Sequence, residues 1–333
     1  MFGTVLTIAS AGTYAGTAAL ASHVDNAVTQ DDLLGDGDGQ HREHVTGPLD
    51  VLLAGSDFRH SWKESKEKPR SDTIMWLHIP RTLDSAYLLS IPRDLEVDIP
   101  AFAPSDFEGS TEKINAAFAH GAKDYQDVAG GMTLLKKTLK QVTGENFQMA
   151  ALVNWDGFKA ITEQLGGVTL CLEEGFTSTQ PGVSNKTLTF QAGCHHYDAE
   201  MALNLVRQRY NYSDSDYGRQ RMQQQFIKQI LKQATQRGVL TSPSKMNAVL
   251  EAAGKALTVD LNGYGIVDLA LALHQVTPSK LVTLQIAHET LPDGNETLQP
   301  VDDALFKALR TDKVDDFLLT HPELVSKGAG SGR

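Results

Sequence analysis

The sequence predicts a single domain of the α/β or α+β class. Three continuous apolar runs, DVLLAG from Asp50, TIMWLHI from Thr73 and SAYLLSI from Ser85, have the length and composition of buried strands. Apolar residues recur at helical spacing further along, for example over 127–142. No repeat at a solenoid period is present. Short strands that alternate with longer helices are typical of this fold class.

The remaining elements continue the alternation. Helices are expected over 113–122, 127–142 and 158–165, and strands at 147–154 and 168–172. Two helices are expected over 198–209 and 217–236, and they carry a dense group of arginines, Arg207, Arg209, Arg219 and Arg221. A further helical pair, a strand at 281–286 and an acidic C-terminal helix complete the domain.

Composition and charge limit the function. With 333 residues, of which 41% are hydrophobic, the chain can bury a large core. The formal net charge of -11 argues against binding nucleic acid along a broad basic face, because such binding needs Lys and Arg to replace phosphate counterions. We therefore expect no nucleic-acid partner, and any anion site must be local.

The N-terminal segment 1–24 contains no Asp, Glu, Lys or Arg and is long enough to cross a bilayer core of about 30 Å. We expect a single-pass membrane anchor here, and an extracytoplasmic domain after it. Two rivals stay open: a cleaved export signal, for which Ala19-Leu20-Ala21 resembles a cleavage site, and a buried N-terminal helix. The acidic, glycine-rich stretch 25–48 is interpreted as a juxtamembrane linker, 49–323 as the folded domain and 324–333 as a loose tail.

Two cysteines, Cys171 and Cys194, are the only ones in the chain, and neither has the spacing of a zinc site. In an oxidising compartment they would pair, which would add roughly 3 kcal/mol to stability in the chain-entropy description. In the cytosol two separate buried thiols are expected instead.

The densest chemical signal is RQRYNYSDSDYGRQRMQQQ, which starts at Arg207 and includes Arg209, Arg219 and Arg221. On a helix Arg219 and Gln223 stand four residues apart and share a face. Guanidinium groups match phosphate oxygens bidentately, so a convergent set of them is typical of a pyrophosphate site. A solvated basic helix face paired with acidic neighbours is the alternative.

Polar residues at the ends of predicted strands form a second candidate set. Asp57 follows the first strand, Asp72 precedes the second and Arg93 follows the third. Loops at strand ends often bind ligands in open α/β sheets. Mg²⁺ takes one or two carboxylates together with water and substrate phosphates, which two such aspartates would satisfy. The alternative is that each aspartate caps a helix or turn.

The order of several motifs resembles one family. GSDFR, RSDT, SIPRD, KINAAF, LVNWDGFKAITEQLGGV, LVRQR and DYGRQRMQQQF, between Asp50 and Gln236, are similar to the LytR-CpsA-Psr family of cell-wall phosphotransferases. The resemblance implies a mixed sheet flanked by helices, with an apolar groove for a polyprenyl tail. The stripe Val128, Met132, Leu135 and Leu139 is either a wall of that groove or plain core.

Carried over by position, the resemblance implies that Asp57 and Asp72 hold Mg²⁺ or Mn²⁺. It assigns the catalytic set Arg93, Arg207, Arg209, Arg219 and Asp72, and the substrate-binding set Arg59, Arg70, Lys113 and Gln223. Asp216 fits the motif as a residue that orients an arginine. Met222 stands where the family often has arginine, and Arg221 receives no role. A Cys171–Cys194 disulfide would match the actinobacterial members.

The implied reaction is transfer of a phosphoglycan from a polyprenyl-pyrophosphate carrier to peptidoglycan. Teichoic acid, arabinogalactan and capsule glycans all fit equally, and Asp72 and Asp94 are the candidates for a general base. Two other classes remain open: a non-catalytic regulator that binds wall glycan or lipid, and a phosphatase in which water replaces the sugar hydroxyl. The S-x-x-K sequence at Ser242 is interpreted as a capped turn, because the companion elements of penicillin-recognising enzymes are missing.

Overall fold

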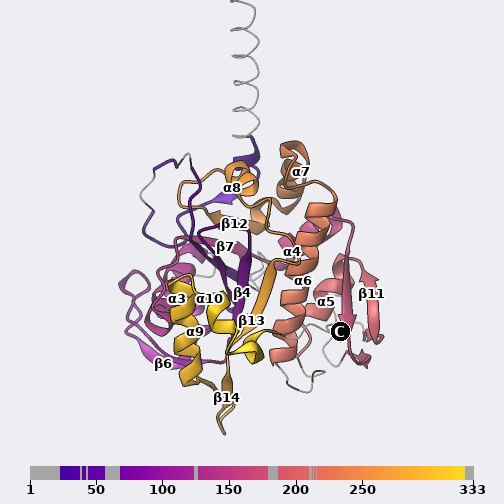
Figure 1. Ribbon diagram of the computed structural model, residues 1–333. Coiled ribbons are helices and arrows are strands. Elements are labelled where there is room, and N and C mark those ends of the chain that lie inside the picture. The colour runs from indigo at the N-terminus through magenta and orange to yellow at the C-terminus, as the bar shows by residue number, and fades with distance from the viewer. Residues whose placement is uncertain are drawn as a thin grey trace, which may run out of the picture.

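The computed structural model describes residues 23–37, 40–42, 44–56, 68–123, 127–178, 187–209, 212, 214 and 216–326. Its centre is a seven-stranded mixed sheet with the order β1-β12-β7-β2-β3-β4-β13 (Figure 1). In that order the strands are Thr29–Gln30, Leu257–Asp260, Met149–Val153, Leu49–Ser56, Ser71–Ile79, Ala86–Ile91 and Leu281–Gln285. The pairs β2–β3, β3–β4 and β7–β12 are antiparallel, and the other three are parallel.

Helices cover both faces of the sheet, which explains why its strands read as continuous apolar runs. Because side chains alternate along a strand, Ile74 and Trp76 of β3 point to one face, into the core beneath α2 (Ala116–Gly121), α3 (Val128–Thr143) and α9 (Pro300–Arg310). Met75 and Leu77 point to the opposite face, where they pack with α6 (Asp216–Gln236) and α8 (Ile266–Ala272). The fold class expected from the sequence is confirmed.

Smaller elements surround the sheet. Four two-stranded ribbons are formed by β5 (Glu96–Ile99) with β6 (Ser110–Lys113), β8 (Val168–Leu172) with β11 (Gly193–Tyr197), β9 (Phe176–Thr177) with β10 (Thr189–Phe190), and β14 (His288–Thr290) with β15 (Glu296–Leu298). The remaining helices are α4 (Trp155–Gln164), α5 (Ala199–Val206), α7 (Pro243–Ala253) and α10 (Val314–Leu318), with short 3₁₀ turns at Ala103–Ser105, Gly254–Ala256 and Pro322–Leu324. Ser242 is the N-cap position of α7 and Pro243 its first residue, in agreement with a turn rather than a nucleophile.

One predicted helix is wrong at its start. The segment 113–122 was expected to be helical, but Lys113 belongs to β6 and pairs with Glu96 of β5, and the helix begins only at Ala116. Cross-strand pairing with a distant segment overrides the local helical pattern here. The change matters because it turns Lys113 toward the end of β4, where the polar site lies.

The chain joins the domain earlier than Leu49. Val24, Leu33 and Leu34 are buried, and β1 runs parallel to β12. The segment 25–48 is therefore not a linker throughout: its few apolar residues are enough to dock its described part on the sheet edge and the main core. At the other end the backbone N–H of Ser326 donates to the carbonyl of Thr283, so packing continues into the expected tail.

Most of the expected membrane anchor, 1–22, lies outside the described residues. Among the residues that are described, the helices are all too short or too polar to span a bilayer.

Cys171 and Cys194 stand opposite each other on β8 and β11 and are joined by a disulfide. The Gln225 side chain of α6 binds both the backbone N–H and the carbonyl of Cys171, at 2.5 and 3.3 Å. The cross-linked ribbon is thereby attached to the long helix that also carries Arg219.

Candidate functional site

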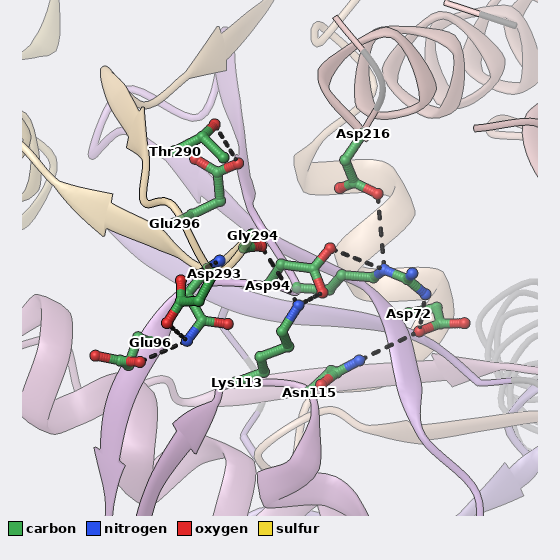
Figure 2. A network of polar contacts seen from close by, with 12 residues as sticks. Asp72, Asp94, Glu96, Lys113, Asn115, Asp216, Thr290, Asp293, Gly294 and Glu296 are labelled. Carbon is green, nitrogen blue, oxygen red and sulfur yellow. Dashed lines mark hydrogen bonds and ion pairs between the residues drawn. The ribbon is translucent and has the colours of Figure 1, made fainter. Parts of the chain in front are cut away.

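Charged side chains from three parts of the chain meet at one end of the central sheet (Figure 2). β3 and β4 are antiparallel with Ile74 opposite Ile91, so Asp72 at the start of β3 meets Arg93 just after the end of β4. Their Oδ1 and Nη1 atoms are 2.5 Å apart. Arg209 follows the end of α5 and Arg219 lies on α6, and both reach the same place.

Asp94 and Asp216 hold the arginines together. The Oδ1 atom of Asp216 lies 2.7 Å from Arg219 Nη2, 3.5 Å from Arg209 Nε and 3.7 Å from Arg93 Nε. Asp94 binds Arg209 Nη2 through Oδ2 at 3.2 Å and Lys113 Nζ through Oδ1 at 2.9 Å. These contacts fix guanidinium groups that would otherwise repel one another.

The site favours an anion. Burial alone would lower the pKa of Arg93, but the carboxylates of Asp72, Asp94 and Asp216 outweigh it and raise that pKa above its ordinary value. Arg219 is almost fully buried, and among the described residues its Nε atom and that of Arg93 find no hydrogen-bond acceptor. Buried charged donors are costly unless they bind an acceptor, and a phosphate would supply one.

An apolar cavity of about 340 Å³ adjoins the arginines. Arg93, Arg207, Arg209, Arg219 and Gln223 line one part of it. Its apolar walls come from β2, β3, β7, α4, α5 and α6, with Leu53, Met75, Val153, Phe158, Leu203, Val206, Phe226 and Ile227. Arg219, Gln223, Phe226 and Ile227 recur at helical spacing, so one face of α6 changes from charged to apolar along the cavity.

The stripe on α3 is not a wall of this cavity. Met132, Leu135 and Leu139 are fully buried in the main core, on the other face of the sheet. The interpretation of this stripe as plain core is confirmed, and its interpretation as a groove wall is wrong. Apolar residues at helical spacing indicate that a helix face is buried, but they do not tell which face of the sheet the helix covers.

Trp155 completes the rim of the cavity and was not anticipated from the sequence. The Arg207 guanidinium lies over its ring, with Cζ 3.6 Å from the ring centroid. Trp155 is the first residue of α4, whose N-cap Asn154 accepts hydrogen bonds from the backbone N–H groups of Asp156 and Gly157. An aromatic residue directly after an N-cap asparagine was the available signal.

The other predicted residues divide into three groups. Gln223 lines the cavity and donates to the Val206 carbonyl at 3.5 Å. Arg70 does not line it; together with Lys113 it lines a neighbouring hollow instead. Asp57 and Arg59 lie outside the described residues. Arg221, which was assigned no role, pairs with Asp214.

Asn115 was also missed, although it belongs to the KINAAF motif. Its Nδ2 atom lies 3.4 Å from Asp72 Oδ1, the same oxygen that binds Arg93. Asp72 is consequently held by two donors through one oxygen, and its Oδ2 atom accepts no hydrogen bond from the described part of the chain. That oxygen fits a single carboxylate ligand of Mg²⁺. The described residues contain no group of three His, Cys, Asp or Glu side chains placed to hold a metal ion.

Comparison with known proteins gives relatives under several names, two of which refer to cell-wall biosynthesis or teichoic acid transfer. The "Probable cell wall biosynthesis protein LcpB" of Corynebacterium glutamicum is 31% identical over 224 residues, which are 64% of this chain and 49% of the relative. The "Polyisoprenyl-teichoic acid--peptidoglycan teichoic acid transferase TagU" of Halalkalibacterium halodurans is 30% identical over 223 residues, 67% of this chain and 64% of the relative. The chain thus spans less than two thirds of either relative's length.

A solved structure shares the fold. Protein gbs0355 from Streptococcus agalactiae superposes with a TM-score of 0.69 at 22% identity, over 83% of this chain and 92% of that one. The family model described as "LytR_cpsA_psr family" matches residues 11–314, which include the sheet, the arginines and the cavity. The chain belongs to this family, as its motifs suggested.

Proposed function

We propose that this protein transfers a phosphate-linked glycan from a polyprenyl-pyrophosphate carrier to peptidoglycan. The observation that carries the proposal is the position of Arg93, Arg207, Arg209 and Arg219 beside an apolar cavity. A polyprenyl pyrophosphate likewise has a charged part and an apolar part. Its two phosphates would bind the guanidinium groups, and its hydrocarbon tail would lie among Leu53, Phe226 and Ile227. The name of the TagU relative, a polyisoprenyl-teichoic acid to peptidoglycan transferase, supports this substrate class.

The chain's own residues would act mainly by positioning and by charge. In the proposed reaction an acceptor hydroxyl oxygen forms a bond to the sugar-side phosphorus, the bond from that phosphorus to the lipid phosphate breaks, and the hydroxyl proton is released. Negative charge then grows on the departing lipid phosphate, where Arg93 and Arg219 stand with unsatisfied Nε donors. Preorganised donors aimed at developing charge commonly supply a large part of the rate gain in phosphoryl transfer.

We also propose that the reaction uses Mg²⁺ or Mn²⁺, held by Asp72 with Asp57 as the second protein ligand. The available Oδ2 atom of Asp72 supports the first assignment, and the second rests on sequence position. Such an ion, when bound, neutralises charge on the pyrophosphate. Arg93 and Asn115 would then serve to aim the Asp72 carboxylate.

The proposed location is the outer side of the cell membrane, with the N-terminal segment that precedes the buried Val24 as a single-pass anchor. Two points support it: the Cys171–Cys194 disulfide, which is typical of oxidising compartments, and the proposed peptidoglycan acceptor, which lies outside the membrane.

A direct assay tests the proposal. Purified protein is incubated with a polyprenyl-pyrophosphate-linked N-acetylglucosamine and with muro-oligosaccharides, with and without Mg²⁺, and products are identified by mass spectrometry. Transfer to the oligosaccharide is expected from the wild type and the control Arg221→Ala, and a loss of at least about 100-fold from Arg219→Ala. Release of lipid phosphate without transfer would favour a phosphatase. Binding of the lipid without any product would favour a regulator.

A further inference from the structure

A second, polar hollow of about 310 Å³ lies beside the arginine site. We call it the side hollow, and it is lined by Arg70, Glu96, Thr111, Glu112, Lys113, Ala116 and Asn295. None of these residues lines the apolar cavity. Its volume is at the lower end of the range of small-molecule sites, about 300–1,000 Å³. The ribbon β5–β6 supplies most of the lining, and the turn between β14 and β15 supplies Asn295.

Lys113 and Asp94 connect the side hollow to Arg209, and Figure 2 shows the Lys113–Asp94 pair. Lys113 Nζ lines the hollow's edge and binds Asp94 Oδ1 at 2.9 Å, while the other Asp94 oxygen binds Arg209. The Lys113 ammonium is also 3.5 Å from the Gly294 carbonyl. A ligand in the side hollow therefore lies next to a phosphate held at the arginines, separated from it by one ion pair.

The lining of the side hollow suits a carbohydrate and not a lipid. Arg70 and Lys113 are donors, Glu96 and Glu112 are acceptors, and Asn295 and Thr111 offer both. The Asn295 amide lies 2.5 Å from Glu96, which holds these groups in place. Among the described residues of the lining, Ala116 is the one apolar side chain. Hydroxyl and acetamido groups of a saccharide need such alternating donors and acceptors.

The geometry of phosphoryl transfer indicates which of the two saccharides, donor or acceptor, the side hollow binds. The attacking and leaving oxygens stand roughly in line on opposite sides of the phosphorus. In the proposed reaction the lipid phosphate leaves toward the apolar cavity, so the attacking hydroxyl must reach the phosphorus from outside that cavity. The side hollow shares no lining residue with the cavity, and Lys113 and Asp94 connect it to Arg209. We infer that the side hollow, resting on the proposed function, binds the N-acetylated saccharide that supplies the acceptor hydroxyl.

Variants that line only the side hollow test this inference. In Asn295→Ala and Thr111→Ala, the KM for a muro-oligosaccharide acceptor should rise about fivefold or more, with the KM for the lipid-linked donor changed less than twofold. Thr82→Ala, on a separate surface hollow, is the matched control and should change neither. An equal rise in both KM values would assign the hollow to the donor's sugar, and unchanged values would remove its role; either result overturns the inference.

A binding titration separates this inference from the proposed function. Isothermal calorimetry with the same oligosaccharide and no lipid donor should show binding to the wild type that weakens at least fivefold in Asn295→Ala. If the wild type binds the saccharide in this way but never transfers a glycan, the proposed function fails while the site stands. If it transfers the glycan but both proteins bind the saccharide equally, the site fails while the function stands.

Discussion

The guanidinium of Arg219 lies 2.7 Å from the carboxylate of Asp216, three residues earlier on α6. The same Asp216 oxygen is within 3.7 Å of Arg93 and Arg209, so one buried carboxylate faces three cations. Its second oxygen accepts a hydrogen bond from Gln220 at 3.2 Å. Asp216 is therefore a positioning residue, which sets where the three arginines stand before a phosphate arrives.

Replacing Asp216 with Asn should lower kcat/KM for glycan transfer by roughly 10- to 150-fold, because the ion pairs to the arginines are lost, an effect comparable to losing a hydrogen bond to a charged group, about 1.5–3 kcal/mol. The size of the side chain is retained, but the negative charge that collects the arginines is lost. Asp214→Asn, which breaks the Arg221 pair outside the cavity, is the control and should change kcat/KM less than twofold. Steady-state kinetics with matched circular dichroism spectra would check this, and wild-type activity in Asp216→Asn would refute the positioning role.

The sequence predicted the sheet better than the site. The strand Ala86–Ile91 is buried on both faces, and an apolar run reports that burial directly. The meeting of Arg93 with Arg219 depends instead on contacts between segments more than a hundred residues apart, which local patterns do not encode. The order of the family motifs predicted that the arginines meet. It did not predict the contact of Trp155 with Arg207, or that Arg70 lies apart from the cavity.

Trp155 should hold Arg207 at the rim of the cavity through its ring face. Cation–π contacts contribute about 0.5–2 kcal/mol, so Trp155→Ala is expected to raise the KM for the lipid-linked donor by about 2- to 30-fold. Trp155→Phe keeps a ring under the guanidinium and should recover most of the loss. If both variants lose the same affinity, the indole contributes by filling space and not by its contact with Arg207.

The apolar cavity should select for chain length. Ile227 lies on α6 along the cavity wall, and Ile227→Trp would fill part of the roughly 340 Å³ space. We expect the Kd for a long polyprenyl pyrophosphate to rise at least about tenfold, while the Kd for isopentenyl pyrophosphate changes less than threefold, because its five-carbon tail needs little of the cavity. Equal weakening of both ligands would show that the substitution disturbs the arginines instead.

Glu145 is buried just after the end of α3, close to Asp50 and His78. His78 and Asp72 lie near opposite ends of β3, so Glu145 is remote from the proposed site. Burial, and after it the negative charge of Asp50, raise its pKa from 4.5 to about 7. Between those two pH values the folded protein keeps the proton while the unfolded chain loses it. Because only the unfolded chain releases this proton between about pH 4.5 and about pH 7, the free energy of unfolding falls as the pH rises through that range. Above about pH 7 this loss of stability stays constant.

Glu145→Gln should remove this penalty, because glutamine does not titrate and its carbonyl can still accept the hydrogen bond that Asn146 N–H donates to Glu145. At pH 8 the variant is expected to be more stable than the wild type by about 3 kcal/mol, and the difference should disappear below about pH 4.5. Urea unfolding at a series of pH values measures it. Glu163→Gln, at an exposed position on α4, should stay within about 0.5 kcal/mol of the wild type throughout. A stability difference for Glu145→Gln that is the same at every pH would mean that packing, and not ionisation of Glu145, is responsible.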